Sequence, residues 1–127
     1  EFIKAFREGG GEGKPMFLQA QTSYASSDDE ALAGAYDQWR NNVFESRVLT
    51  ELRMPNQFDL MGQFVRPEDL HDHIRISSYP QQHIDWLRQD IDLGFERIFI
   101  HNVNREQEQF IDVFGAKVLP ALQLRQE

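Results

Sequence analysis

The sequence contains no cysteine, which excludes a disulfide framework, a thiolate metal site and a cysteine nucleophile, and which fits a reducing compartment. It also lacks an apolar run near the roughly twenty residues that a membrane-spanning helix needs, and it lacks a basic block. Thirteen Lys and Arg residues stand against 21 Asp and Glu residues, and the formal net charge is −8. This charge disfavours nucleic acid and anionic membrane surfaces as partners. We therefore expect a cytoplasmic protein.

The start of the chain predicts that it belongs to something longer. A length of 127 residues suits one domain or part of a larger one. The chain opens without Met, and Phe2, Ile3 and Phe6 form the apolar stripe of what looks like the end of a helix. We expect the chain to be the C-terminal part of a longer protein.

Breakers and apolar periodicity divide the chain into a helix end, a linker, three strand–helix units and an inserted helical connection. In chain order, these are the helix end 1–8, the Gly-rich linker 9–15, the first unit 16–44, the insert 45–73, the second unit 74–93 and the third unit 95–123.

Local signals support these units. Ser27 followed by Glu30 forms a capping box, so we expect a helix from there to about Phe44. In the second unit, a helix after Pro80 should turn Ile84, Leu87 and Ile91 inward, and Gly94 should cap it. In the third unit, the run Ile98-Phe99-Ile100 is typical of a strand covered on both faces, and residues 118–120 are expected to form a tail.

Alternating strands and helices indicate an α/β fold with parallel strands and helices on both faces. Three strands make a thin sheet with two exposed edges. We expect a missing partner, which is either an N-terminal segment that supplies further strands or another copy of the chain.

Several ordered motifs carry a resemblance that spans almost the whole chain. They are Gly9-Gly10-Gly11-Glu12-Gly13-Lys14-Pro15, Gln19-Ala20-Gln21 with Ser23-Tyr24-Ala25, Asp29-Glu30-Ala31 with Asp37-Gln38-Trp39-Arg40, Val65-Arg66-Pro67-Glu68-Asp69, and Gly94-Phe95 through His101-Asn102-Val103 to Phe110-Ile111-Asp112-Val113-Phe114-Gly115 with Val118-Leu119-Pro120. Their order and spacing resemble the C-terminal portion of bacterial luciferase-like flavin or deazaflavin oxidoreductases. The most similar branch is that of flavinoid oxidoreductases that do not use deazaflavin.

The resemblance implies an eight-stranded βα (TIM) barrel, of which the chain supplies the last three strand–helix units with extra helices inserted after the first. It implies flavin-dependent hydride transfer or monooxygenation on a small-molecule substrate, with FMN or a deazaflavin bound by the full-length parent. We expect the isolated chain to bind neither cofactor tightly and to be inactive, and we expect the parent to be a homo-oligomer.

In barrel enzymes the chemistry lies at the C-terminal ends of the strands, so polar residues there are the candidates for contact with cofactor or substrate. On the first strand these are Gln19, Gln21 and Ser23, which alternate onto one face. Contact with neighbouring strand ends or buried water is the alternative role for these side chains.

The second and third strands add further candidates. Ser77 and Ser78 precede a helix whose amides could bind an anion, although an N-cap role is favoured over phosphate contact. His101 and Asn102 end the third strand, where an imidazole could donate a proton or serve as a structural group.

Other polar or aromatic residues receive structural interpretations. His71 and His73 diverge and lack a third ligand, so we expect no metal site. Trp39 falls on the buried stripe of its helix and is interpreted as core. No catalytic residue can be named from the sequence. The alternative function is that of a non-enzymatic α/β interaction module that assembles through its sheet edges.

Overall fold

The computed structural model describes residues 1–123 and contains three parallel strands in the order β2-β1-β3. The central strand is β1 (Phe17–Ser23), which pairs with β3 (Arg97–Asn102) from Phe17 to Thr22. On its other side, β1 pairs with β2 (Arg75–Ile76) only at Thr22 and Ser23. The expected α/β class with parallel strands is therefore present.

Helices and single turns connect the strands. The helices are α1 (Phe2–Phe6), α2 (Asp28–Trp39), α3 (Ser46–Glu51), α4 (Pro55–Gly62), α5 (Pro80–Asp92), α6 (Gln107–Val113) and α7 (Leu119–Gln123). The turns are η1 (Arg7–Gly11), η2 (Arg40–Asn42), η3 (Pro67–Asp72) and η4 (Phe114–Val118). No helix within residues 1–123 is both long enough and apolar enough to cross a membrane.

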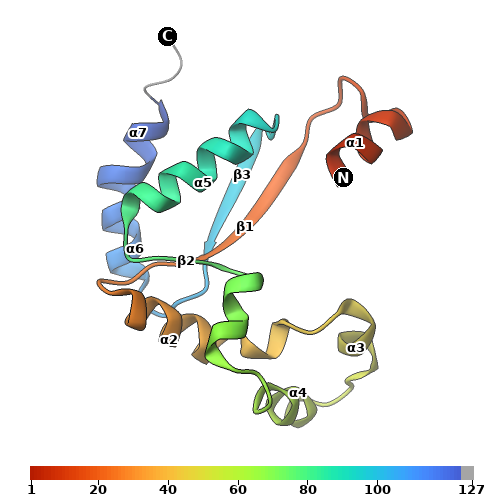
Figure 1. Ribbon diagram of the computed structural model, residues 1–127, viewed down its shortest axis with the longest axis vertical. Helices are drawn as coiled ribbons and strands as arrows, with labels where there is room; N and C mark the ends of the chain where they lie inside the picture. The colour runs from red at the N-terminus through yellow and green to blue at the C-terminus, as the bar shows by residue number, and fades with distance from the viewer. Residues whose placement is uncertain (124–127) are drawn as a thin grey trace.

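One face of the sheet is covered by α5, α6, η4 and α7, which lie together on one side of the strands (Figure 1). Ile98 and Ile100 of β3 pack there against Leu87 of α5 and against Phe114 and Val118 of η4. Burying aliphatic and aromatic side chains of this size contributes roughly 1.5–3 kcal/mol each. This core fixes the position of α5, which carries several residues of the candidate site.

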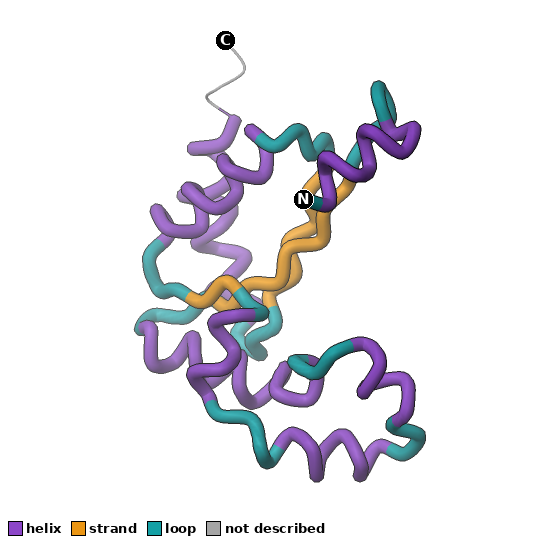
Figure 2. Tube along the Cα trace, turned by 45° about the vertical axis from the view of Figure 1, so that its right-hand side comes forward, coloured by secondary structure: helices purple, strands orange, loops and turns teal. Residues whose placement is uncertain are grey.

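A second core lies at the C-terminal ends of the strands. Ala31 and Ala35 of α2 pack there with Leu70 of η3, Ile76 of β2 and Val103 after β3. The capping box predicted at Ser27 is present, because its side chain accepts a hydrogen bond from the Glu30 amide. From this end of the sheet, α3 and α4 extend away as a separate arm (Figures 1 and 2).

The opposite face of the sheet is not covered by the described residues. It presents alternate side chains of two strands, Phe17, Gln19 and Gln21 from β1 and Arg97, Phe99 and His101 from β3. We call this set the open face. Phe17 is 55% exposed and Phe99 is 58% exposed, although both are large aromatic residues. Residues 1–123 therefore cover only one face of β3.

The strand order also differs from the expectation. Three successive barrel units would place β2 between its two sequence neighbours, whereas β1 occupies the middle. β2 is short because η3 occupies the chain just before it and because Ser78, just after it, turns away to Asp28. The assignment of the chain to three consecutive barrel units is not confirmed.

Several local expectations need correction. The helix that starts after Ser27 ends at Trp39, and residues 40–42 form a tighter turn, so it does not reach Phe44. Ile91 is 44% exposed, because the neighbouring Asp90 takes the inward position and meets an arginine of β2. Residues 118–120 are helical, so they do not form an irregular tail. Gly94 ends α5 with φ of +93°, as predicted.

The glycine-rich segment 9–15 is only partly a linker. Residues up to Gly11 continue the first helix as a wide turn, in which Gly10 adopts φ of +102°. Arg7 donates hydrogen bonds to the carbonyls of Gly11 and Lys14, each at 2.8 Å. These bonds tie the turn to the residues just before β1.

Candidate functional site

The open face brings together three of the predicted site residues. In the β1–β3 register, Gln21 lies beside His101 and Gln19 lies beside Phe99. Side chains of a strand alternate between faces, so the neighbouring Ala20 and Ile100 point to the helices instead. Gln19, Gln21 and His101 therefore form one polar group near the C-terminal half of the sheet.

His101 is held in place by Trp39 at the end of α2. The two ring centroids lie 5.2 Å apart at an interplanar angle of 78°, which is an edge-to-face contact. The Nδ1 atom of His101 is buried and has no hydrogen-bond partner among the described residues. A buried polar atom without a partner is uncommon and marks a place where a ligand or water completes the structure. Trp39 packs on the core, as predicted, and also positions this imidazole.

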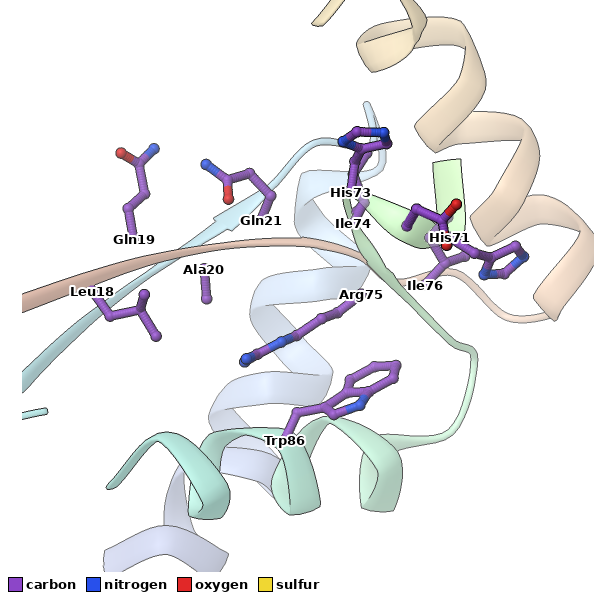
Figure 3. A pocket seen from close by; sticks show the side chains of 11 residues that line it. Leu18, Gln19, Ala20, Gln21, His71, His73, Ile74, Arg75, Ile76 and Trp86 are labelled. Carbon is purple, nitrogen blue, oxygen red and sulfur yellow. The ribbon is translucent and has the colours of Figure 1, made fainter. Parts of the chain in front are cut away.

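A pocket of about 340 Å³ opens beside the unpaired edge of β1. Gln19, Gln21 and His73 point to one side of β1, and Arg75 and Trp86 point to the other (Figure 3). We call it the edge pocket; the rest of its lining is Leu18, Ala20, His71, Asp72, Ile74 and Ile76. It exists because β2 pairs with β1 only at Thr22 and Ser23.

Backbone groups as well as side chains face the edge pocket. The Ser23 carbonyl accepts a hydrogen bond from Ser77 on the β2 side, whereas the Thr22 carbonyl accepts one from Val103 on the β3 side. Peptide groups of alternate residues in a parallel strand point to opposite edges. The N–H and C=O groups of Gln19 therefore point toward the pocket, whereas Gln21 lies next to the β1–β2 ladder at Arg75.

Arg75 crosses the bottom of the pocket to a carboxylate on α5. Its guanidinium binds Asp90 through two bonds of 2.5 and 2.9 Å, and Asp90 is 4% exposed. A two-bond pair of this kind is strong and directional. It fastens α5 to β2 and neutralises Arg75 within the edge pocket. This pair was not predicted from the sequence, in which Ile91 was expected to take the inward position that Asp90 occupies.

A buried histidine that was not predicted from the sequence joins β1 and the segment after β2 to α5. His83 is 2% exposed, with Nε2 at 2.9 Å from the Ser77 carbonyl and Nδ1 at 3.0 Å from the Thr22 hydroxyl. Because a carbonyl only accepts, Nε2 carries a proton. The Thr22 hydroxyl donates its one proton to the Arg75 carbonyl at 2.9 Å, so its contact with Nδ1 has no assigned direction. Burial lowers the pKa of His83, and the hydrogen bond to Ser77 opposes this shift only in part.

The predicted residues Ser23 and Asn102 do not join the open face. Ser23 is fully buried and donates a hydrogen bond of 2.6 Å to the Ala31 carbonyl of α2. The Asn102 side chain accepts a hydrogen bond from the Tyr24 amide at 3.3 Å, and its Nδ2 atom has no partner among the described residues. Ser23 is therefore held by α2 as a structural group, whereas Asn102, like His101, keeps a buried nitrogen atom without a partner among the described residues.

Ser77 and Ser78 neither cap α5 nor point at a common ligand position. The N-cap residue of α5 is Tyr79, without a side-chain hydrogen bond to the helix. Ser77 accepts a hydrogen bond from the Tyr79 amide, and Ser78 donates two to Asp28, at 2.7 and 2.8 Å. The favoured N-cap role is therefore wrong, because Ser78 binds Asp28 in the first turn of α2 instead of the start of α5.

A second pocket of about 460 Å³ adjoins the first at the start of α5. Asp28, Asp29 and Tyr79 line it, and it shares His71, Ile76 and Trp86 with the edge pocket. The Ser78 hydrogen bonds lower the pKa of Asp28, so this carboxyl stays ionised at neutral pH. Within residues 1–123, no three His, Asp or Glu side chains lie close enough to hold a metal ion.

The chain is similar to known deazaflavin-dependent enzymes. The chain is 34% identical over 108 residues to the F420-dependent glucose-6-phosphate dehydrogenase of Microbacterium testaceum, a match that covers 85% of this chain and 32% of the relative. The chain is thus similar to a deazaflavin-dependent dehydrogenase. The enzyme of the same name from Intrasporangium calvum is 29% identical over 68 residues, which cover 54% of this chain and 20% of that relative. No protein-family model matches the chain.

The fold is shared with an F420-dependent secondary alcohol dehydrogenase solved with an F420–acetone adduct. The TM-score is 0.75 at 17% sequence identity, and the match covers 95% of this chain and 37% of that protein. The chain spans about a third of the length of the Microbacterium testaceum relative. These matches support the resemblance to luciferase-like oxidoreductases that use a deazaflavin. They do not support the expected branch, which does not use deazaflavin.

Proposed function

We propose that this chain forms part of a deazaflavin-dependent oxidoreductase that oxidises or reduces a small molecule by hydride transfer. The observation that supports it most is the 34% identity to an F420-dependent dehydrogenase across 85% of the chain. The polar group on the open face agrees with it, because such enzymes need hydrogen-bonding side chains around an uncharged reacting group. Monooxygenation and FMN, both considered from the sequence, have no comparable support.

The residues of the open face fit one part of such a cofactor or its substrate. Amide and imidazole groups of Gln19, Gln21 and His101 can bind carbonyl, N–H and hydroxyl groups. When bound, the deazaflavin ring supplies the hydride chemistry. This chain contributes position, with Trp39 and His83 holding the walls of the site in place.

The open face also supports the proposal that the active protein contains more strands than this chain provides. Phe17 and Phe99 are more than half exposed, and the β1 edge is unpaired next to Gln19 and Gln21. In the complete enzyme, these surfaces face the remainder of a barrel. The isolated 127-residue chain should then bind no deazaflavin tightly and show no activity.

The test is cofactor binding by the full-length protein that carries this chain. Titration with F420 and with FMN, followed by absorbance and fluorescence, should give tight binding of F420 and weak or no binding of FMN. The proposed function fails if the full-length protein binds neither, or if it binds FMN in preference to F420.

The second candidate is an α/β interaction module that assembles through its sheet edges. The observation in its favour is the unpaired edge of β1, which is a template for another strand. Sedimentation of the 127-residue chain addresses it. A defined dimer or higher oligomer that is lost when Gln19 is replaced by Pro supports edge pairing, and a monomer across all concentrations argues against it.

A further inference from the structure

A small cavity lies between the sheet and α5, next to the edge pocket. Its volume is about 10 Å³, and we call it the inner cavity. Arg75 and Trp86, which lie on the helix side of β1, line both spaces (Figure 3). The rest of its lining is Ala20, Thr22, His83, Leu87, Ile100 and Phe114. A cavity needs roughly 10–15 Å³ to hold one water molecule, so this one has room for a single water and for no larger ligand.

The hydrogen bonds around His83 are one proton short. The imidazole makes two contacts, from Nε2 to the Ser77 carbonyl at 2.9 Å and from Nδ1 to the Thr22 hydroxyl at 3.0 Å. The Thr22 hydroxyl makes a third contact, to the Arg75 carbonyl at 2.9 Å. A neutral imidazole and a hydroxyl carry one proton each, and the two carbonyl groups accept both of them. Nδ1 is therefore an acceptor that faces an oxygen atom with no proton between them.

The surroundings of His83 oppose a second proton on its ring. The side chain is 2% exposed, and the rings of Tyr24, Trp86 and Phe114 pack around it. Burial is the larger cause of its lowered pKa, and the charge of Arg75 acts in the same direction. Nδ1 therefore stays unprotonated at neutral pH and needs a donor from another group.

The inner cavity offers a position for that donor. A buried water molecule typically makes about three hydrogen bonds to polar groups that lack other partners. His83 Nδ1 can accept one bond, and the Thr22 oxygen has a lone pair that can accept another. The Arg75 guanidinium carries five N–H groups, of which Asp90 takes two, so it can donate the third bond.

We propose that the inner cavity binds one water molecule, which donates hydrogen bonds to His83 Nδ1 and to Thr22 and accepts one from Arg75. This water joins β1, β2 and α5, and it fixes the imidazole that packs against Trp86 in the wall of the edge pocket. The proposal does not depend on the proposed function, because residues of this chain alone form the inner cavity.

The first test is a crystal structure of the full-length protein at about pH 8, where an unperturbed imidazole is neutral. We expect one ordered water in the inner cavity, at a hydrogen-bond distance of about 2.7–3.2 Å from Nδ1. An ordered His83 beside a cavity without density overturns the proposal.

The protonation of Nδ1 is tested separately by nitrogen NMR of the histidine-labelled full-length protein at the same pH. Loss of one signal in His83→Gln assigns the ring. We expect a proton on Nε2 alone. Protons on both nitrogen atoms overturn the proposal, because Nδ1 would then donate to Thr22 and would need no water.

A double-mutant cycle tests whether the water stabilises the protein. Ala20→Val fills the inner cavity and should lower the denaturation midpoint of the unchanged protein, because it leaves Nδ1 without a donor. In the His83→Phe background, Ala20→Val should lower the midpoint less, because the ring there has no acceptor to leave unpaired. Phe is no smaller than His, so overpacking acts in both backgrounds. An equal or larger loss in the His83→Phe background contradicts the proposed water.

Discussion

Gln21 and His101 lie directly beside each other on neighbouring parallel strands, on the face that α5, α6 and α7 leave open. The amide comes from the middle of the sheet, and the imidazole comes from the edge strand and is fixed by Trp39 of α2. Three elements thus converge on one pair of hydrogen-bonding side chains. The buried Nδ1 atom of His101 has no partner among the described residues, which supports the proposal that the pair binds a ligand.

Replacing either side chain should weaken substrate binding without unfolding the protein. In the full-length protein, Gln21→Ala and His101→Ala should each raise KM about tenfold, because each change removes one hydrogen bond to the ligand. His101→Gln retains a hydrogen-bonding group and should recover part of the loss. Gln63→Ala, at an exposed position, is the control that should leave KM unchanged. Unchanged KM in both alanine variants would argue against the pair as a ligand contact.

The buried His83 should make stability depend on pH. Its pKa in the folded protein is lowered by burial and by the nearby charge of Arg75, whereas in the unfolded chain it is about 6.5. Below about pH 6.5, the unfolded chain takes up a proton that the folded protein does not take up. The free energy of unfolding should therefore decrease as the pH falls through this range.

This dependence can be measured by chemical unfolding of the protein and of His83→Gln between about pH 7.5 and pH 5.5. The free energy of unfolding of the unchanged protein should fall across this range, and that of the variant should fall less. Four carboxyl groups also have lowered pKa values, but their contributions to stability are lost only in more acidic solution. They are Asp28, Glu30, Asp37 and Asp69. Parallel curves for the two proteins would exclude His83 as the cause.

The two partners of the Arg75–Asp90 pair should differ in the cost of their removal. Asp90 is 4% exposed, whereas the Arg75 side chain is 32% exposed. Arg75→Met leaves a buried carboxylate without a partner and should cost about 3 kcal/mol or more, whereas Asp90→Leu leaves an arginine that water can reach and should cost less. Denaturant unfolding measures both costs. The exposed Arg105–Asp37 pair is the control, and its removal should change stability little.

Gly34 of α2 should tolerate no side chain. A Cβ atom there would lie 2.1 Å from Nδ2 of the buried Asn104, which itself donates to Ser23. Gly34→Ala should therefore destabilise the protein by about 1–3 kcal/mol, measured as a lower denaturation midpoint. Gly115 has open space around it, and Gly115→Ala should be neutral or stabilising by up to about 1 kcal/mol. Equal effects of the two changes would contradict the packing seen here.

The elements with strong local signals could be predicted from the sequence. The capping box at Ser27, the proline that begins α5 and the positive φ of Gly94 depend only on neighbouring residues. The parallel strands followed from the alternation of strand and helix patterns. The strand order could not be predicted in this way, because it depends on how residues 71–78 pack against α2 and α5.

The part of the candidate site that depends on the strands could be predicted from the sequence. Gln19, Gln21 and His101 share a face because strand alternation and register place them there. Ser23, Ser78 and Asn102 have the same polar character, but they form hydrogen bonds with neighbouring elements that the sequence does not reveal. A signal for His83 was present, since its spacing from Leu87 places it on the buried side of α5.

The most direct test of the account is F420 binding by the full-length protein compared with the same protein carrying Gln21→Ala and His101→Ala. The account predicts tight binding of F420 by the unchanged protein, a clear preference over FMN, and turnover that falls in the double variant. A full-length protein that is folded by circular dichroism and yet shows no change in F420 absorbance or fluorescence would contradict it.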